Sequence, residues 1–156
     1  MNSSGEFTGD FPYAVIDDVI DRALREDLSL GDATTDALIP SGLPGAANLV
    51  ARSTGVLAGV QVACEGFRRV DPSLESEPLM EDGLRLEPGQ VIARISGSMA
   101  GILKAERTAL NLLQRMSGIA TMTAELVDAV KGTNARIIDT RKTAPGLRAL
   151  DKYSVT

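Results

Sequence analysis

Thr140, Arg141 and Lys142 are the residues of this chain whose types and order most clearly favour ligand binding. They follow the apolar pair Ile137-Ile138, which with its neighbours predicts a short buried strand over 135–139, and they precede a Thr-Ala-Pro-Gly turn at 143–146. Arginine offers a planar fork suited to a carboxylate, and lysine a compact charge suited to a phosphate. The threonine adds a hydroxyl donor. The pattern indicates a site for a small, strongly anionic ligand, and the alternative is ordinary surface charge.

The segment 136–152 is locally cationic although the whole chain is acidic. The 156 residues carry a net charge of −5, which disfavours nucleic acid or an anionic membrane as a partner because both need a basic face. Aromatic residues, which would stack on single-stranded bases, make up only 3%. Segment 136–152 nevertheless has three more cations than anions. The cations are Arg136, Arg141, Lys142, Arg148 and Lys152, and the anions are Asp139 and Asp151.

Arg107 is a second candidate for anion binding, because it lies near the expected start of a helix over 105–131. Free N–H groups at a helix start favour anions, so an arginine there could present its charge to a ligand at an interface. The alternative is an exposed arginine paired with Glu106.

Three acids could serve as acid–base groups or metal ligands, but their spacing matches no known ligand set, and we interpret them as structural. These are Glu106, Asp139 and Asp151. We assign no catalytic residue and no metal ligand within the chain.

Several kinds of site are excluded by composition. The chain has no histidine, so it cannot supply a Ser-His-Asp triad, a Cys-His pair or a histidine-based zinc site. No Walker A loop or Gly-x-Gly-x-x-Gly sequence is present. The single cysteine, Cys64, cannot form an intrachain disulfide, and we interpret it as a small buried residue on a helix. Residues 1–12 lack the features of a signal peptide and predict a disordered lead-in, so we expect a cytoplasmic protein.

The elements that must position these residues fall into two predicted parts. Over 13–104 the pattern predicts an α+β module, and over 105–156 it predicts the start of an α/β module. In the first part, apolar residues at helical spacing indicate a helix that ends near Leu28, and Gly31–Thr35 is expected to be a loop with capping residues. The other expected elements of this part are strands at 48–52, 56–60, 78–81, 84–86 and 91–95 and a short helix at 63–70.

Two glycines have specific expected roles. Asp82-Gly83 lies between two short apolar stretches, which predicts a hairpin turn joining them. Gly118 lies inside the helical pattern of 105–131 and indicates either close packing or a break between two helices. A helix followed by a buried strand, with cations at the strand end, is how an α/β barrel or open sheet places its site.

Three motifs, in order and spacing, resemble the quinolinate phosphoribosyltransferase family, the carboxylating nicotinate-nucleotide pyrophosphorylases of NAD biosynthesis. They are Ala105–Asn111, Ser117–Thr121 and Asp139–Thr143. Three earlier motifs are similar to the same family, and the resemblance runs from about residue 13 to the end of the chain. They are Glu26–Leu28, Gly31–Thr35 and Gly55–Gly59.

The resemblance implies an N-terminal open-faced α/β sandwich, hammerhead-like, over 13–104, followed by the beginning of an incomplete α/β barrel over 105–156. It also implies a homodimer or higher homo-oligomer, in which the N-terminal module of one subunit covers the site at the barrel mouth of the other. By motif match, Arg107 would reach the partner's site. Thr140, Arg141 and Lys142 would line the site of their own subunit.

The implied activity is that of a glycosyltransferase, more narrowly a pentosyltransferase. It would convert quinolinate and phosphoribosyl pyrophosphate to nicotinate mononucleotide, pyrophosphate and CO₂, with Mg²⁺ accompanying phosphoribosyl pyrophosphate. The resemblance places the Mg²⁺ ligands and phosphate-binding loops beyond Thr156, so we expect the chain to be the N-terminal part of a longer protein and to lack a complete site alone. The alternatives are a phosphoribosyltransferase with another heterocyclic acceptor and an inactive fragment that serves only in assembly.

Overall fold

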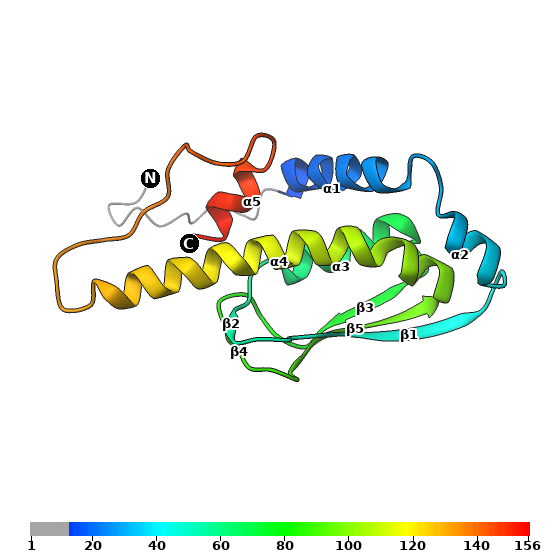
Figure 1. Ribbon diagram of the computed structural model, residues 1–156, viewed down its shortest axis with the longest axis horizontal. Helices are drawn as coiled ribbons and strands as arrows, with labels where there is room; N and C mark the ends of the chain where they lie inside the picture. Colours follow the sequence, from blue (N-terminus) through cyan, green and yellow to red (C-terminus); the bar gives the residue numbers. More distant parts are fainter. Residues whose placement is uncertain (1–12) are drawn as a thin grey trace.

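The computed structural model describes residues 13–156, and the predicted lead-in over 1–12 lies outside the described residues. Three layers are stacked in it: a β-sheet, then α3 and α4, then α1 and α5 (Figure 1). The helices are α1 (Tyr13–Leu28), α2 (Ala33–Leu38), α3 (Val60–Val70), α4 (Met99–Ala129) and α5 (Arg148–Tyr153). The strands are β1 (Pro44–Val50), β2 (Gly55–Val56), β3 (Glu75–Pro78), β4 (Arg85–Leu86) and β5 (Val91–Ser98).

The sheet is antiparallel, with the order β1-β5-β3, while β2 and β4 form a separate two-stranded ribbon. Ser96 pairs with Ala46 on one side and with Glu75 on the other, and all three residues are exposed. Helices α3 and α4 cover one face of the sheet (Figure 1). The other face carries small and polar side chains at these positions, so the predicted open-faced sandwich is confirmed.

Two apolar clusters separate the layers. The first lies between the sheet and the α3–α4 layer and includes Phe67 and Ile95, which are buried. The second joins α1 and α5 to α4 and includes Ile20, Met116 and Leu150, which are fully buried. The helical spacing that predicts α1 corresponds to its buried face, since a stripe with this period faces one neighbour.

The first turn of α3 fits closely against α4. Gly59 precedes the helix with φ of +92°, a conformation that favours glycine, and a Cβ atom there would lie 2.4 Å from the sulfur of Met116. The carboxylate of Asp82 accepts hydrogen bonds from the backbone N–H groups of Gly59 (2.7 Å) and Val60 (3.0 Å). Asp82 therefore supplies the cap that the sequence before α3 lacks.

The predicted hairpin at Asp82-Gly83 is wrong. β3 pairs with β5 and β4 pairs with β2, so the two stretches that flank the turn do not pair with each other. Gly83 does form a turn with φ of +88°, and its N–H donates to the carbonyl of Leu57 at 2.8 Å. Long-range pairing therefore overrides the local turn signal here.

Two helices are misplaced by the sequence patterns. The loop expected over Gly31–Thr35 ends earlier, because the short helix α2 begins at Ala33. The expected capping is confirmed: Asp32 accepts from the N–H (3.0 Å) and hydroxyl (2.6 Å) of Thr35. These hydrogen bonds lower the pKa of Asp32, and the bond from the Thr35 hydroxyl has the larger effect. Helix α4 begins at Met99, where Ser98 caps it, six residues before the predicted start. The predicted division at residues 104 and 105 falls within α4 and stays a prediction.

The predicted strand at 135–139 is also wrong: these residues belong to no regular secondary structure. A strand needs a neighbour to satisfy its backbone hydrogen bonds, and within residues 13–156 none lies beside this stretch. Ile138 is accordingly 77% exposed rather than buried.

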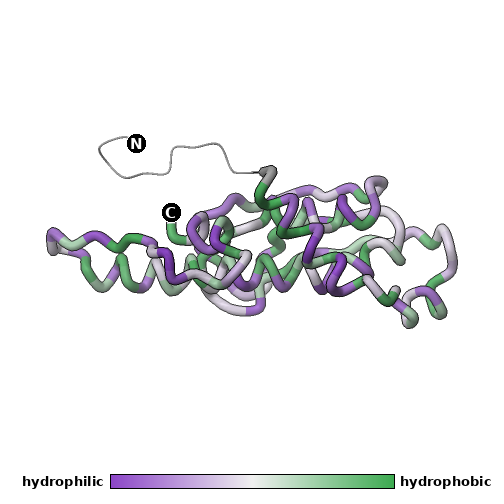
Figure 2. The backbone as a smooth tube through the Cα atoms, turned by 90° about the horizontal axis from the view of Figure 1, so that it is seen from above, coloured by the Kyte–Doolittle hydropathy of each residue, from purple (hydrophilic) through white to green (hydrophobic). Residues whose placement is uncertain are grey.

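The C-terminal part of α4 projects beyond the other elements, with hydrophobic and hydrophilic residues alternating along it (Figure 2). Met122, Leu126 and Val127 are between 43% and 65% exposed there. This part of α4 thus carries apolar side chains that the rest of the described chain leaves uncovered. Among residues 13–156, no helix has the length and hydrophobicity needed to cross a membrane.

Replacement of Gly59 by alanine is expected to destabilise the chain more than replacement of Gly83. Both glycines have positive φ, so each substitution costs about 1–2 kcal/mol in backbone strain. Only Gly59→Ala also places a methyl group against Met116, which adds about 1–3 kcal/mol by overpacking. Urea unfolding of the two variants measures the difference, and equal losses would contradict the close fit of α3 against α4.

Candidate functional site

Thr140, Arg141 and Lys142 lie in the segment between α4 and α5, and all three residues are exposed. We call residues 139–147 the cationic loop. The backbone N–H of Lys142 donates to the hydroxyl of Thr140 at 3.0 Å, which holds the three residues in a tight turn. Within the described chain, the side chains of Arg141 and Lys142 have no hydrogen-bond or ion-pair partner. Their charges are therefore available to a ligand.

The two acids of this region are occupied in holding the loop. Asp139 forms an ion pair with Lys152 of α5. Asp151, also in α5, is 8% exposed and accepts two hydrogen bonds of 2.9 Å from the guanidinium of Arg115 in α4. It accepts a third bond of 3.0 Å from the backbone N–H of Ala144. These contacts support the interpretation of both acids as structural.

A positive surplus remains after these pairs are formed. Arg148 donates to the hydroxyl of Thr143 at 3.2 Å rather than to a carboxylate. Arg136 has no hydrogen-bond or ion-pair partner among the described residues. Together with Arg141 and Lys142, these side chains make the loop and its surroundings a region where an anion would gain electrostatic energy.

Arg107 lies about two turns inside α4 rather than at its start, because the helix begins at Met99. The expectation that free N–H groups surround it is wrong, since the backbone there belongs to the helix interior. Its side chain is exposed and, within residues 13–156, is joined to the cationic loop by no hydrogen bond or ion pair. The structure places Thr140, Arg141 and Lys142 on one loop and Arg107 on α4.

The motif Ser117–Thr121 has a structural role that the sequence patterns do not reveal. The hydroxyl of Ser117 accepts from the N–H of Ala58 (3.1 Å) and donates to its carbonyl (3.2 Å). The hydroxyl of Thr121 accepts from the N–H of Val56 at 2.9 Å. Two of the motifs in the resemblance thus bind each other and attach β2 to α4.

Gly118, inside the same motif, is exposed, and α4 continues through it without a break. A Cβ atom at this position would meet no described atom within 4 Å. The expectation of close packing or a helix break at Gly118 is therefore wrong for the part of the chain that the structure describes.

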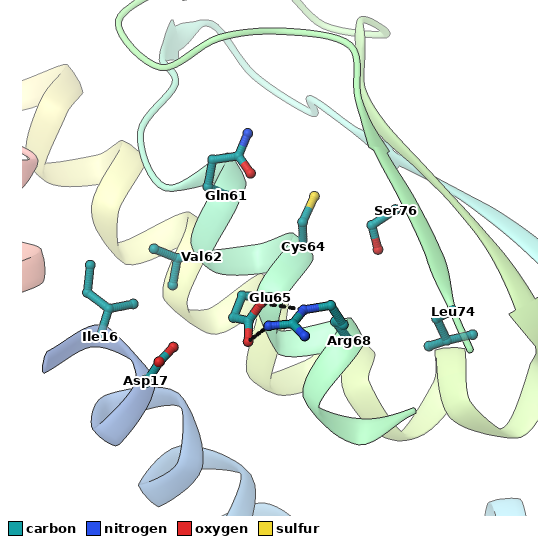
Figure 3. A pocket seen from close by; sticks show the side chains of 9 residues that line it. All are labelled: Ile16, Asp17, Gln61, Val62, Cys64, Glu65, Arg68, Leu74 and Ser76. Atoms are coloured by element: carbon teal, nitrogen blue, oxygen red, sulfur yellow. Dashed lines mark hydrogen bonds and ion pairs between the residues drawn. The ribbon is translucent and has the colours of Figure 1, made fainter. Parts of the chain in front are cut away.

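Residues of α1 and α3, with Leu74 and Ser76 at β3, line a pocket (Figure 3). None of these lining residues belongs to the cationic loop. Arg68 and Glu65 at its rim pair with each other, with bonds of 2.8 and 2.7 Å. Cys64 points toward this pocket but is 8% exposed, and burial, assisted by the negative charge of Asp82, raises the pKa of its thiol to about 11. The thiol is protonated at neutral pH, and the interpretation of Cys64 as a buried helical residue is confirmed.

No described residues form a metal site. Among residues 13–156, no three histidine, cysteine, aspartate or glutamate side chains come close enough together to hold a metal ion. Asp139, in the cationic loop, forms an ion pair with Lys152, and Asp151, in α5, forms one with Arg115.

Comparison with known families gives two adjoining matches. The model described as "Quinolinate phosphoribosyl transferase, N-terminal domain" matches residues 32–117, which is more than half of the chain. The model described as "Quinolinate phosphoribosyl transferase, C-terminal domain" matches residues 119–156.

Curated relatives and solved structures agree with these matches. The nicotinate-nucleotide pyrophosphorylase [carboxylating] of Mycobacterium leprae is 48% identical, over 88% of this chain and 50% of its own length. The mitochondrial quinolinate phosphoribosyltransferase [decarboxylating] 2b of Nicotiana tabacum is 43% identical, over 92% of this chain and 41% of its own length. The crystal structure of NadC from Streptococcus pyogenes matches with a TM-score of 0.87 and 40% sequence identity. The match covers 92% of this chain and 52% of that one. The chain thus spans about half the length of the relatives it matches.

Cys64 is expected to react slowly with thiol reagents while the protein is folded. With its pKa at about 11, the thiolate fraction at pH 8 is roughly 100-fold below that of an ordinary thiol. The rate of reaction with a chromogenic disulfide, measured before and after unfolding in guanidinium chloride, checks this. Equal rates in the two states would contradict the burial of the thiol.

Proposed function

Because the chain belongs to the quinolinate phosphoribosyltransferase family, we propose that it forms part of the substrate site of an enzyme of de novo NAD biosynthesis. This enzyme converts quinolinate and phosphoribosyl pyrophosphate to nicotinate mononucleotide, pyrophosphate and CO₂. The single observation that carries the proposal for this chain is the pair of exposed cations Arg141 and Lys142 on an anchored loop, whose side chains form no hydrogen bond or ion pair within residues 13–156. The names of the relatives support the choice of substrates.

The reaction joins two molecules that are both multiply anionic. The ring nitrogen of quinolinate attacks C1 of the ribose, and the bond from C1 to the pyrophosphate oxygen breaks, so pyrophosphate leaves with the electron pair. The bond between ring C2 and its carboxylate then breaks, CO₂ leaves, and C2 keeps the electron pair and takes up a proton. Fixed cations are needed because they offset the mutual repulsion and hold the ring in line with C1.

The side chains of the cationic loop divide this work by their chemistry. Arg141 would bind a quinolinate carboxylate, since its planar guanidinium can donate two parallel hydrogen bonds to the two carboxylate oxygens. Thr140 and Lys142 would hold the pyridine ring or the phosphoribosyl group. Arg107, which is not joined to the loop within this chain, would grip a carboxylate in the site of a second subunit of a homodimer or higher homo-oligomer.

Mg²⁺ enters this proposal only as the companion of phosphoribosyl pyrophosphate. The described residues assemble no group of three or more possible ligands for it, so we assign none of them to the metal and derive no step through it.

We also propose that the protein works in the cytoplasm, which fits its single unpaired thiol, Cys64.

Arg141→Ala is expected to lower the kcat/KM of the full-length protein by about 2–4 kcal/mol of transition-state stabilisation, the usual cost of losing a preorganised charge-stabilising group. The measurement is the release of labelled CO₂ from carboxyl-labelled quinolinate in the presence of phosphoribosyl pyrophosphate. An unchanged kcat/KM would remove Arg141 from the site. A wild-type protein that releases no CO₂ would overturn the proposed function, and a panel of other heterocyclic acceptors would then test a related phosphoribosyltransferase.

Mixing inactive variants tests whether Arg107 acts across subunits. In a heterodimer of Arg107→Ala and Arg141→Ala subunits, one site contains both substitutions and the other contains neither. Coexpression of the two variants should therefore restore measurable CO₂ release, up to about half of the wild-type rate for pure heterodimer if dimer sites act independently. Homodimers of each variant are the controls. No recovery in an isolated heterodimer would show that Arg107 does not serve the partner's site.

A further inference from the structure

The cationic loop is held at both ends by two adjacent residues of α5. Lys152 pairs with Asp139, immediately before Thr140, and Asp151 accepts the N–H of Ala144, two residues after Lys142. Four residues lie between these anchors. Within the described chain, the side chains of Arg141 and Lys142 make no hydrogen bond or ion pair, and the hydroxyl of Thr140 accepts only the N–H of Lys142. The hydroxyl of Thr143 accepts from Arg148, which also belongs to α5. The polar contacts that tie this stretch to the rest of the fold therefore come from α5.

The anchors are themselves fixed to the rest of the fold. Asp151 is nearly buried and receives both Arg115 donors at 2.9 Å, a bidentate geometry that sets direction as well as distance. Leu150, the preceding residue, is fully buried in the cluster shared by α1, α4 and α5. Tyr153 donates its hydroxyl to Asp82 at 2.7 Å, which ties α5 to the cap of α3. A continuous set of contacts thus leads from α3 and α4 to the loop.

We infer that Asp139, Asp151, Lys152 and Arg115 are positioning residues for substrate binding, which hold Arg141 where it can receive a quinolinate carboxylate and hold Thr140 and Lys142 beside it. This inference rests on the proposed function. None of the four needs to touch the substrate, because each acts through the backbone of the cationic loop or through another anchor. Charge alone does not explain the pairs, since Asp139 and Asp151 reduce the positive surplus that attracts the ligand.

The test uses Lys152→Met and Asp151→Asn in the full-length protein. Both substitutions are expected to raise the KM for quinolinate about tenfold or more while changing kcat much less, since small misplacements of binding groups can cost up to ~100-fold. Hydrogen–deuterium exchange of the peptide covering 139–147 should rise in both. Arg85→Met, which breaks the exposed pair of Arg85 with Asp128 away from the loop, is the matched control and should change neither.

A charge swap separates positioning from simple loss of stability. Asp139→Lys combined with Lys152→Asp restores an ion pair of opposite direction, and it should return the KM to within about threefold of wild type if the pair only holds the loop. Lys152→Met remains informative if Asp151→Asn does not fold, because the Asp139–Lys152 pair is partly exposed. An unchanged KM in Lys152→Met, or a swap no better than the single variant, would overturn the inference. A wild-type protein without quinolinate-dependent CO₂ release would overturn the proposed function itself.

Discussion

Helix α4 packs against α3 and the sheet on one side and against α1 and α5 on the other, so its side chains must satisfy two layers at once. Ala109 lies opposite Gly66 of α3, where small residues let the helices approach closely. Met116 fills the space that Gly59 leaves open. One turn of the same helix supplies Arg115 to α5 and Ser117 to the segment before α3. Helix α4 therefore fixes the positions of both α5, which anchors the cationic loop, and the segment before α3.

The same physical solution recurs at several places where a backbone N–H group lacks a backbone partner. Unpaired N–H groups inside a fold are costly, and here side-chain oxygens accept their hydrogen bonds. Asp82 does so for the start of α3, Ser117 and Thr121 for the chain around β2, and Asp151 for the cationic loop. Polar residues that the sequence presents as candidates for chemistry thus include several whose work is structural.

How far sequence predicts this protein depends on the range of the interaction involved. The periodicity that predicts α1 and most of α4 comes from local patterns with one buried face, and both helices form. The turn at Asp82-Gly83 forms too, but its hairpin does not, because β3 and β4 choose distant partners. The binding role of Arg141 and Lys142, predicted from residue type, stays a prediction, and both residues are exposed. The bond between Arg115 and Asp151 joins residues 36 positions apart, and no local pattern could indicate it.

The side-chain bonds made by three consecutive residues of α5 also limit where insertions and deletions can be tolerated in the chain. Asp151, Lys152 and Tyr153 each bind a different element, to Arg115, Asp139 and Asp82 respectively. One inserted or deleted residue in α5 would rotate the following side chains by about 100° and misdirect these bonds together. Residues 130–138 are mostly exposed and lie outside regular structure. Length variation among homologues should therefore concentrate between α4 and the cationic loop and avoid the segment from 139 to 153.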